Sequence, residues 1–338
     1  MPALLSQRYS RPNVTVLQAP GNAGAGIREG GSMRVGTFNA TSLGSVDGAL
    51  AWSRAAAEAG FDALWFPQVM GLDALGVLTV VAREVPDVHL GTAVVPIQGR
   101  HPLPLALQAL TVASAAGPER FTLGVGVTHA AISEGWLGVP YRGIVDVCAE
   151  VLTALNGLLG PDRRADLDGA HVTVHAAAMV DAPEPSLMLA GLAPRMVDLA
   201  GAQTDGTITW MTGPVTLGRD ITPALRAAAE RAGRPAPRVV VGIPVCVTDD
   251  EAGARERVAS MMARSASMPA YARQMAAEGL TDPVDLVVLG DEDAVAARLA
   301  AYGAAGMTEL CANLMGSPEE RARTAEFLTG AGRDTVRP

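Results

Sequence analysis

The stretch Arg120–Ala130, RFTLGVGVTHA, is the part of the chain whose residue types and spacing most directly suggest chemistry. An apolar run passes through Gly-Val-Gly and ends on Thr128 and His129. It predicts either a glycine loop that cradles a nucleotide or a buried strand that carries a histidine at its tip. The dinucleotide fingerprint G-x-G-x-x-G needs a third glycine where this chain has His129. The spacing therefore favours the strand over a Rossmann dehydrogenase.

His129 is the titratable side chain that such a strand would bring to a site. The charge of an imidazole changes near neutral pH, so His129 is a candidate proton donor or hydrogen-bonding partner of a cofactor ring. A surface histidine with a structural role is the alternative. His89 begins a different strand, at the opposite end of the sheet, and we expect it to be structural.

The segment 189–201, LAGLAPRMVDLAG, predicts a second kind of site. A strand ends at Ala190-Gly191, Pro194 occupies a first-turn position and an amphipathic helix follows. Free backbone N–H groups at that helix start, with Arg195 beside them, would hold a phosphate. A plain strand-to-helix turn is the alternative. The next strand ends beside it, and Thr212 in its turn joins the cofactor-binding candidates.

Glycine-ended helices recur along the chain and define the elements that position these residues. Four helical stretches end on Ala-Gly and lead into short apolar runs, at 51–66, 111–126, 195–210 and 300–314. Such alternation predicts parallel strands buried between helices. We expect eight strands, at 34–39, 63–67, 89–95, 121–127, 186–191, 206–211, 239–246 and 308–314. The predicted fold is a (β/α)8 TIM barrel.

Two longer connections interrupt this alternation. Helical patterns over 249–265 and 268–279 predict an insertion between strands seven and eight. The segment 161–185 predicts an irregular loop or a small hairpin. The barrel is expected over 33–330, with a flexible Gly-, Pro- and Ser-rich extension at 1–32 and a tail at 331–338.

Neutral hydrogen-bonding side chains dominate the carboxyl ends of the expected strands, where a barrel of this type holds its ligand. They are Asn39, Gln68, Gln98, Thr128 with His129, Gly191, Thr212 and Asn313. No carboxylate pair, metal-ligand spacing or GxSxG motif accompanies them, so no metal is expected. Such a site suits a cofactor that supplies its own redox chemistry.

The overall composition excludes several classes of partner. The net charge of −9 argues against nucleic acid, and all 26 basic residues are arginine, which removes Schiff-base chemistry. Three separated cysteines, Cys148, Cys246 and Cys311, are expected to be reduced core residues. No membrane-spanning run or signal peptide is recognised. We expect a cytoplasmic protein with a small-molecule substrate.

Taken in order, GFDALWFPQ (60–68), LGTAVVPI (90–97), PERFTLGVGVTH (118–129), the segment 189–214 and AGMTELCANL (305–314) resemble the luciferase-like monooxygenase superfamily. The similarity is greatest to the branch that uses the deazaflavin coenzyme F420. The resemblance implies a cis peptide at Ala93-Val94 behind the cofactor ring. It also implies ring contacts from Gln68, Thr128 and His129, and a phosphate site at Gly191, Leu192, Ala193 and Arg195.

One departure from that branch bears on the reaction. Its sugar-phosphate dehydrogenases carry Asp-His where this chain has Gln68-Val69. A reductase fits better, in which hydride passes from C5 of reduced F420 to an activated C=C or C=N and His129 supplies the proton. An FMN-dependent monooxygenase and a non-catalytic flavin-binding barrel are the alternatives. The apolar loops mildly favour a bulky, weakly charged substrate, and a homodimer is common in the family.

Overall fold

The computed structural model describes residues 33–39, 44–68, 70–266, 269–330 and 332–335. The predicted extension, 1–32, and residues 331 and 336–338 of the predicted tail lie outside the described residues. The rest of that tail forms a short helix, α13 (Gly332–Thr335), from which Arg333 donates a hydrogen bond to Asp62. This part of the tail therefore contacts the barrel domain.

Eight parallel strands in the described chain close into a barrel, as predicted. Each pairs in parallel with the barrel strands on either side, and the last pairs with the first. They are β1 (Arg34–Phe38), β2 (Ala63–Phe66), β3 (His89–Thr92), β5 (Phe121–Gly126), β8 (Ser186–Ala190), β9 (Gly206–Trp210), β10 (Arg238–Val247) and β12 (Glu309–Leu314). The third strand is shorter than predicted: it stops at Thr92 and resumes as β4 (Val95–Pro96).

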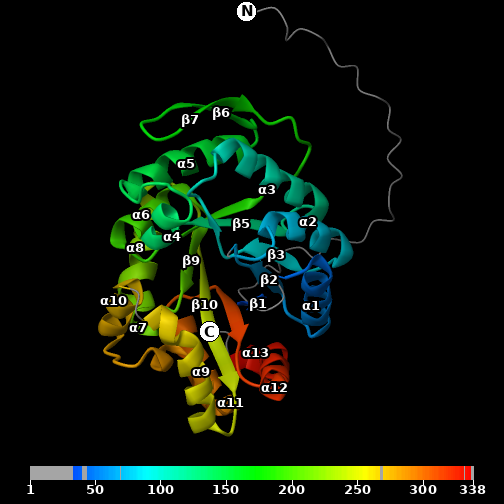
Figure 1. The fold of residues 1–338 in the computed structure, drawn as a ribbon, viewed down its shortest axis with the longest axis vertical. Helices are drawn as coiled ribbons and strands as arrows, with labels where there is room; N and C mark the ends of the chain where they lie inside the picture. Colours follow the sequence, from blue (N-terminus) through cyan, green and yellow to red (C-terminus); the bar gives the residue numbers. More distant parts are fainter. Residues whose placement is uncertain (1–32, 40–43, 69, 267–268, 331, 336–338) are drawn as a thin grey trace, which may run out of the picture. The chain divides into compact units, whose positions relative to one another are not determined.

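Helices cover the outside of this barrel (Figure 1). They are α1 (Val46–Glu58), α2 (Ala74–Glu84), α3 (Pro102–Ala116), α5 (Ile144–Leu159), α6 (Pro194–Gln203), α8 (Thr222–Arg231), α11 (Glu292–Ala304) and α12 (Pro318–Thr329), with the short α4 (Ala130–Gly135) and α7 (Pro214–Thr216) and a π-helical turn, η1 (Leu217–Ile221).

Three of the four predicted Ala-Gly helix endings are confirmed. Gly60, Gly117 and Gly306 have φ values of 95°, 89° and 99°, which glycine adopts without a Cβ clash. The ending predicted at Gly201 is wrong, because α6 continues past it. A Cβ at Gly201 would lie 2.4 Å from the carbonyl oxygen of Leu225, so this glycine allows α8 to pack closely on α6.

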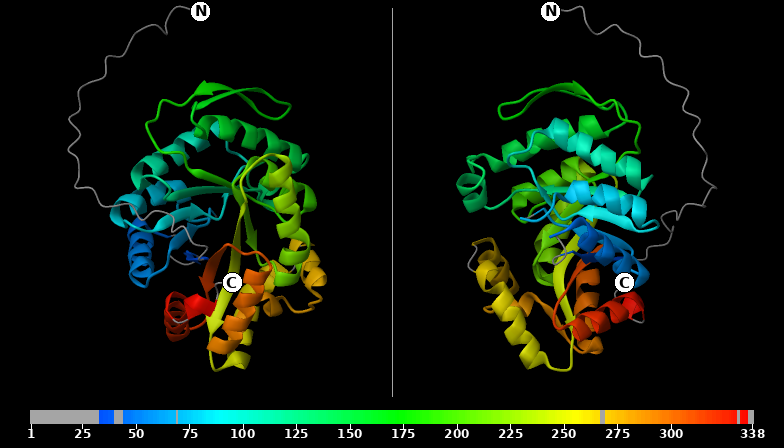
Figure 2. Two further views of the ribbon diagram at one scale, coloured as in Figure 1. Left: turned by 180° about the vertical axis from the view of Figure 1, so that it is seen from behind. Right: turned by 45° about the vertical axis from the view of Figure 1, so that its right-hand side comes forward.

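The two predicted interruptions are confirmed. An antiparallel hairpin, β6 (Arg164–Asp168) and β7 (Thr173–Ala177), packs outside α5. The insertion before β12 holds α9 (Glu251–Ala266), α10 (Pro269–Glu278), a 3-10 turn, η2 (Pro283–Leu286), and β11 (Val288–Gly290). The green hairpin and the yellow and orange insertion lie at opposite ends of the barrel domain (Figure 2). Strand β11, which pairs with β10, was not predicted, because three residues show no periodic pattern.

Glycines make room for large side chains inside the barrel. Trp65 is fully buried there, and a Cβ at Gly91 would lie 2.4 Å from its ring. A Cβ at Gly124 would lie 2.0 Å from the carbonyl oxygen of Thr92 and 2.5 Å from Cδ1 of Ile208. The first glycine of the Gly-Val-Gly run is therefore required by interior packing.

A charged cluster closes the amino-terminal end of the barrel. Glu309, whose side chain is 2% exposed, accepts hydrogen bonds from Arg238 at 2.8 Å and from the indole of Trp65 at 2.9 Å, and Arg34 lies 3.4 Å away. His89 is buried nearby, as predicted for a structural residue. Burial, together with the charges of Arg34 and Arg238, holds the pKa of His89 well below its usual range.

The outer face of the hairpin carries a histidine between two carboxylates. The ring nitrogens of His175 bond to Asp166 and, at 3.0 Å, to Asp168, and these bonds raise the pKa of His175. Because the charged imidazole is favoured in the folded state, this contribution to stability is complete below the pKa of unfolded histidine. It is lost as the pH rises through the folded pKa.

We expect an NMR titration of the wild-type protein to place the pKa of His175 above the ordinary value of about 6.5. Asp166→Asn should move it back toward that value, whereas Asp181→Asn, an exposed change elsewhere, should leave it in place. An unshifted His175 in the wild type would contradict the hairpin geometry.

Candidate functional site

The mouth of the barrel, defined as the carboxyl ends of its eight strands, contains the cis peptide that the resemblance implied. The bond between Ala93 and Val94 is cis. The Val94 carbonyl accepts the Gln68 N–H at 3.3 Å, which ties the end of β2 to this bond. A Cβ at Gly126 would lie 2.7 Å from Cγ2 of Val94 and 3.2 Å from Cβ of Ala190. These contacts join the ends of β2, β3, β5 and β8 into one surface.

Two aromatic rings extend this apolar surface across the mouth. Phe38, at the end of β1, lies with its ring centroid 5.0 Å from that of Trp210, at the end of β9, and the ring planes are tilted by 36°. Both are partly buried, and Phe38, Ala93, Val94 and Ala190 pack on one interior cluster. Phe38 was not among the residues predicted from the sequence. The alternation of β1, which sends every second residue inward, is the signal that would have found it.

Two glutamines fasten the loops of the mouth. The Gln68 side-chain oxygen accepts the backbone N–H of Ala74 at 2.8 Å, at the start of α2. Gln98 is 7% exposed, and its side-chain oxygen accepts the N–H of Thr128 at 3.0 Å. The Nε2 of Gln98 is buried without a partner among the described residues. The Gln68 side chain therefore helps to hold the start of α2.

Thr128 and His129 follow the end of β5, as predicted when the segment was interpreted as a buried strand. Thr128 is partly buried and His129 is exposed. His129 is the N-cap residue of α4, yet its side chain makes no capping bond. Its carbonyl group accepts the N–H groups of Ile132 and Ser133, both at 2.9 Å. The backbone of His129 thus holds α4, and its imidazole is left to other contacts.

The predicted phosphate turn follows β8 and begins α6. Gly191 and Leu192 are partly buried, and Ala193 and Arg195 are exposed. Ala193 is the N-cap residue, so no side chain caps this helix. The Arg195 guanidinium lies 3.3 Å from Asp146, and both side chains are more than 60% exposed. Anion binding at this turn would therefore depend chiefly on backbone N–H groups and the helix dipole.

In the neighbouring turn, after β9, backbone N–H groups are already bonded to a side chain from elsewhere in the chain. Thr212 is fully buried, and its Oγ1 has no partner among the described residues. The carboxylate of Glu278, from α10, accepts the N–H groups of Val215 at 3.2 Å and Thr216 at 2.6 Å. Glu278 was not predicted from the sequence, because it lies 66 positions after Thr212 and no local pattern marks it.

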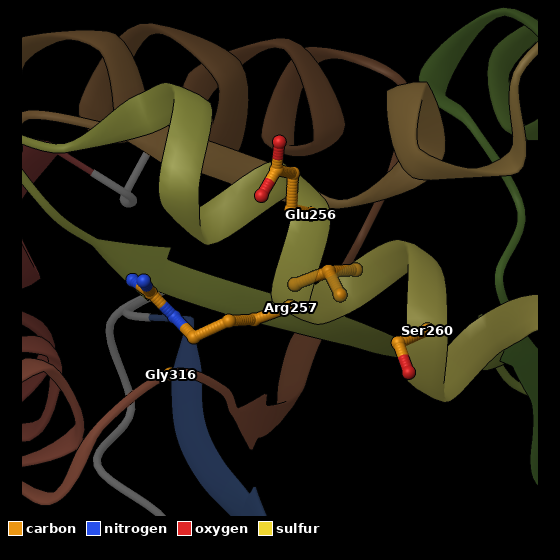
Figure 3. A pocket seen from close by; sticks show the side chains of 5 residues that line it. Glu256, Arg257, Ser260 and Gly316 are labelled. Atoms are coloured by element: carbon orange, nitrogen blue, oxygen red, sulfur yellow. The ribbon is translucent and has the colours of Figure 1, made fainter.

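A cavity of about 490 Å³ lies between α9 and the turn after β12 (Figure 3). Glu256, Arg257, Val258 and Ser260 line it from α9, and Gly316 lines it from the turn. Arg257 bonds to Glu320 at 2.7 Å and lies 3.6 Å from Asp250, so its charge is balanced. This cavity therefore offers no free cation for a phosphate.

Other reactive groups in the described chain are buried or dispersed. Cys148, Cys246 and Cys311 are free and buried, as predicted. Burial raises the pKa of Cys148 to about 12, that of Cys246 to about 11, and that of Cys311 in the same direction, so all stay protonated thiols. Among the described residues, no three His, Cys, Asp or Glu side chains gather as a metal site. Nor does any described helix have the length and apolarity to span a membrane.

Fold and mouth together define a (β/α)8 barrel of the bacterial-luciferase type, with an insertion before its last strand. The chain belongs to the luciferase-like monooxygenase family, whose model matches residues 28–309. A Mycobacterium tuberculosis protein named as a coenzyme F420-dependent oxidoreductase is 26% identical over 302 residues, which cover 75% of this chain and 87% of that protein.

Two solved structures share this fold at low sequence identity. An F420-dependent secondary alcohol dehydrogenase, in complex with an F420–acetone adduct, is 19% identical with a TM-score of 0.77, covering 91% of this chain and all of that one. The F420-dependent tetrahydromethanopterin reductase from Methanopyrus kandleri is also 19% identical, with a TM-score of 0.73 and coverage of 88% and 97%. A monooxygenase of the same fold contains FMN.

Proposed function

We propose that this protein is an F420-dependent oxidoreductase that acts as a reductase. The proposal is based on two features of the same barrel mouth. One is a continuous apolar surface from Val94 to Trp210, and the other is the uncapped start of α6. The relative from M. tuberculosis, named as an F420-dependent oxidoreductase, and the F420-dependent enzymes of like fold support the cofactor.

The residues of the mouth fit the chemistry of a deazaflavin. Gly126 packs so closely that a Cβ there would lie 2.7 Å from Cγ2 of Val94 and 3.2 Å from Cβ of Ala190, so a flat ring on this surface would meet backbone and small side chains. Gln98 and Thr212 have buried polar atoms without partners among the described residues. The N–H groups at the start of α6 would hold the phosphate, and Thr128 and Gln68 would meet the ring edge.

The groups of the chain have separate tasks in this proposal. Bound reduced F420 supplies a hydride equivalent at C5. The mouth positions the acceptor, an activated C=C or C=N, and its apolar surface excludes water. His129 holds a proton next to the acceptor and delivers it to the atom adjacent to the reduced carbon. The Asp-His pair of the sugar-phosphate dehydrogenases is replaced by Gln68-Val69, so the base histidine is missing at Val69, a position outside the described residues.

An FMN-dependent monooxygenase is the second candidate. An FMN-containing monooxygenase has the same fold, and the uncapped α6 start would serve an FMN phosphate equally well. A non-catalytic flavin-binding barrel is a third candidate, because a protein can bind the cofactor ring without catalysing a reaction.

We also propose a substrate class, a compartment and an oligomeric state. Trp136 and Leu137, after α4, are 62% and 48% exposed, and Met70, after β2, is 74% exposed. Exposed apolar side chains on loops of the mouth favour a bulky, weakly charged small molecule. We propose a cytoplasmic homodimer with no nucleic acid partner.

Cofactor titration tests the proposal directly. We expect the apoprotein to quench the fluorescence of F420 on binding and to bind FMN far more weakly. Ala193→Asp should weaken F420 binding at least about tenfold, equivalent to about 1.4 kcal/mol, because a carboxylate would cap α6 where the phosphate binds. Ala193→Asn, which caps the helix without a charge, is the matched control and should weaken binding less.

The same variants separate a binding effect from a folding effect. Both should raise stability by about 0.5–1 kcal/mol, because Asp and Asn are preferred N-cap residues. Tight FMN binding without F420 binding would overturn the F420 proposal in favour of the monooxygenase.

A further inference from the structure

The end of helix α10 brings a carboxylate to the barrel mouth. Glu278, the last residue of α10, is partly buried, and its two oxygens accept the N–H groups of Val215 and Thr216. Figure 1 shows α10 beside α7, where these N–H groups lie. A carboxylate thus accepts the first N–H groups of helix α7, as a bound anion would.

The helix that starts here is long enough to favour a negative charge. Helices α7, η1 and α8 run without a break from 214 to 231, so their aligned peptide dipoles end at Glu278. Pro214 has no N–H, which leaves Val215 and Thr216 as the first donors. A Cβ at Gly213 would lie 2.2 Å from the carboxyl carbon of Glu278, so the carboxylate is seated directly against the backbone.

The two neighbouring turns of the mouth therefore differ. Strands β8 and β9 pair side by side, and each leads into a helix. The start of α6 has no side-chain cap, whereas the start of α7 is filled by Glu278. One anion site on this edge of the barrel is open, and the other is closed by the chain itself.

Among the described residues, Arg219 is a cation close enough to act on Glu278, but it is held by Asp220 through two hydrogen bonds at 2.9 and 2.7 Å. Thr212 and Thr216 contribute buried hydroxyl oxygens, and Gln274 of α10 a buried amide oxygen, each without a partner among the described residues. The turn after β9 thus combines a negative charge with neutral polar groups.

We propose that Glu278 is a specificity-determining residue. It latches the insertion onto the barrel mouth and excludes anionic substrate groups from the turn after β9, so the substrate is uncharged where it meets this turn. The inference rests on the proposed function only in taking the mouth as the substrate site. A phosphorylated substrate would have to displace the Glu278 carboxylate from the N–H groups of Val215 and Thr216.

The test uses the full chain without cofactor, so its outcome does not depend on which cofactor binds. In Glu278→Ala we expect hydrogen exchange at Val215 and Thr216, and along α10, to be at least about tenfold faster than in the wild type. Glu278→Gln, which can still accept these bonds, should show a smaller increase and serves if the alanine variant does not fold. Glu256→Gln, on the other insertion helix, should exchange as the wild type does.

Inorganic phosphate is the probe for the excluded group. Calorimetric titration should find more tightly bound phosphate in both Glu278 variants than in the wild type, and no change in Glu256→Gln. Unchanged exchange at Val215 and Thr216 would overturn the latch. Faster exchange without any gain in phosphate binding would overturn the exclusion of anions. A failed F420 titration would instead count against the proposed function alone.

Discussion

The His129→Ala variant is expected to transfer hydride about 10²–10⁴-fold more slowly than the wild type, with little change in cofactor affinity. This is the range by which a positioned proton donor accelerates a reaction. The change should be local, because the carbonyl group of His129 holds α4 and its imidazole makes no capping bond. Single-turnover reduction of a substrate by the F420H2-loaded enzyme, followed at the deazaflavin absorbance, measures the rate.

Two further variants show whether His129 donates a proton or only a hydrogen bond. His129→Asn keeps a hydrogen-bond donor but cannot transfer a proton near neutral pH. If His129 donates the proton, the Asn variant should be as slow as the Ala variant and its rate should lose the pH dependence of the wild type. His171→Ala, an exposed change in the hairpin turn, should leave the rate unchanged. Full activity in His129→Ala would remove His129 from the mechanism.

Glu309→Ala is expected to lower the free energy of unfolding by about 3–5 kcal/mol, the usual cost of removing one partner of a buried ion pair. Glu309 is 2% exposed, whereas Arg34 and Arg238 are 29% and 26% exposed. The substitution would leave two guanidinium groups and the indole N–H of Trp65 without their shared acceptor. Urea unfolding, monitored by circular dichroism, gives the free energy directly.

A surface pair of the same chemistry provides the control. Arg54 and Glu84 are 2.8 Å apart but each is 50% exposed, so Glu84→Ala should cost no more than about 1 kcal/mol. Glu309→Gln, which keeps an acceptor oxygen, should fall between the two. If Glu309→Ala is no less stable than Glu84→Ala, the cluster does not contribute to closing the barrel.

Local patterns in the sequence predicted the repeating parts of the fold well. Alternating helices and strands gave the eight barrel strands, because strands buried on both faces are continuous apolar runs. Glycine gave three helix ends, where a positive φ excludes other residues. It failed at Gly201, because the same residue type also serves close packing, and a sequence does not distinguish these two uses.

The residues of the candidate site likewise include some that the sequence predicted and some that it did not. Thr128, His129 and the start of α6 were predicted because each directly follows its own strand along the chain. The cis peptide at Ala93-Val94 came from family resemblance, since nothing in the residues themselves requires it. Phe38 was missed although the alternation of β1 marks it as an inward residue. Glu278 on the turn after β9 was missed because its contact joins segments far apart in sequence.

By itself, then, the sequence determined the barrel and the order of the strand ends that form its mouth. Hydrophobic period, helix caps and strand ends are properties of neighbouring residues, and they are encoded locally. Only the tertiary structure decided which of two adjacent helix starts is bonded by a carboxylate and which has no side-chain cap. That choice depends on a carboxylate from an insertion more than 60 residues away, and such a contact exists only once the barrel has closed.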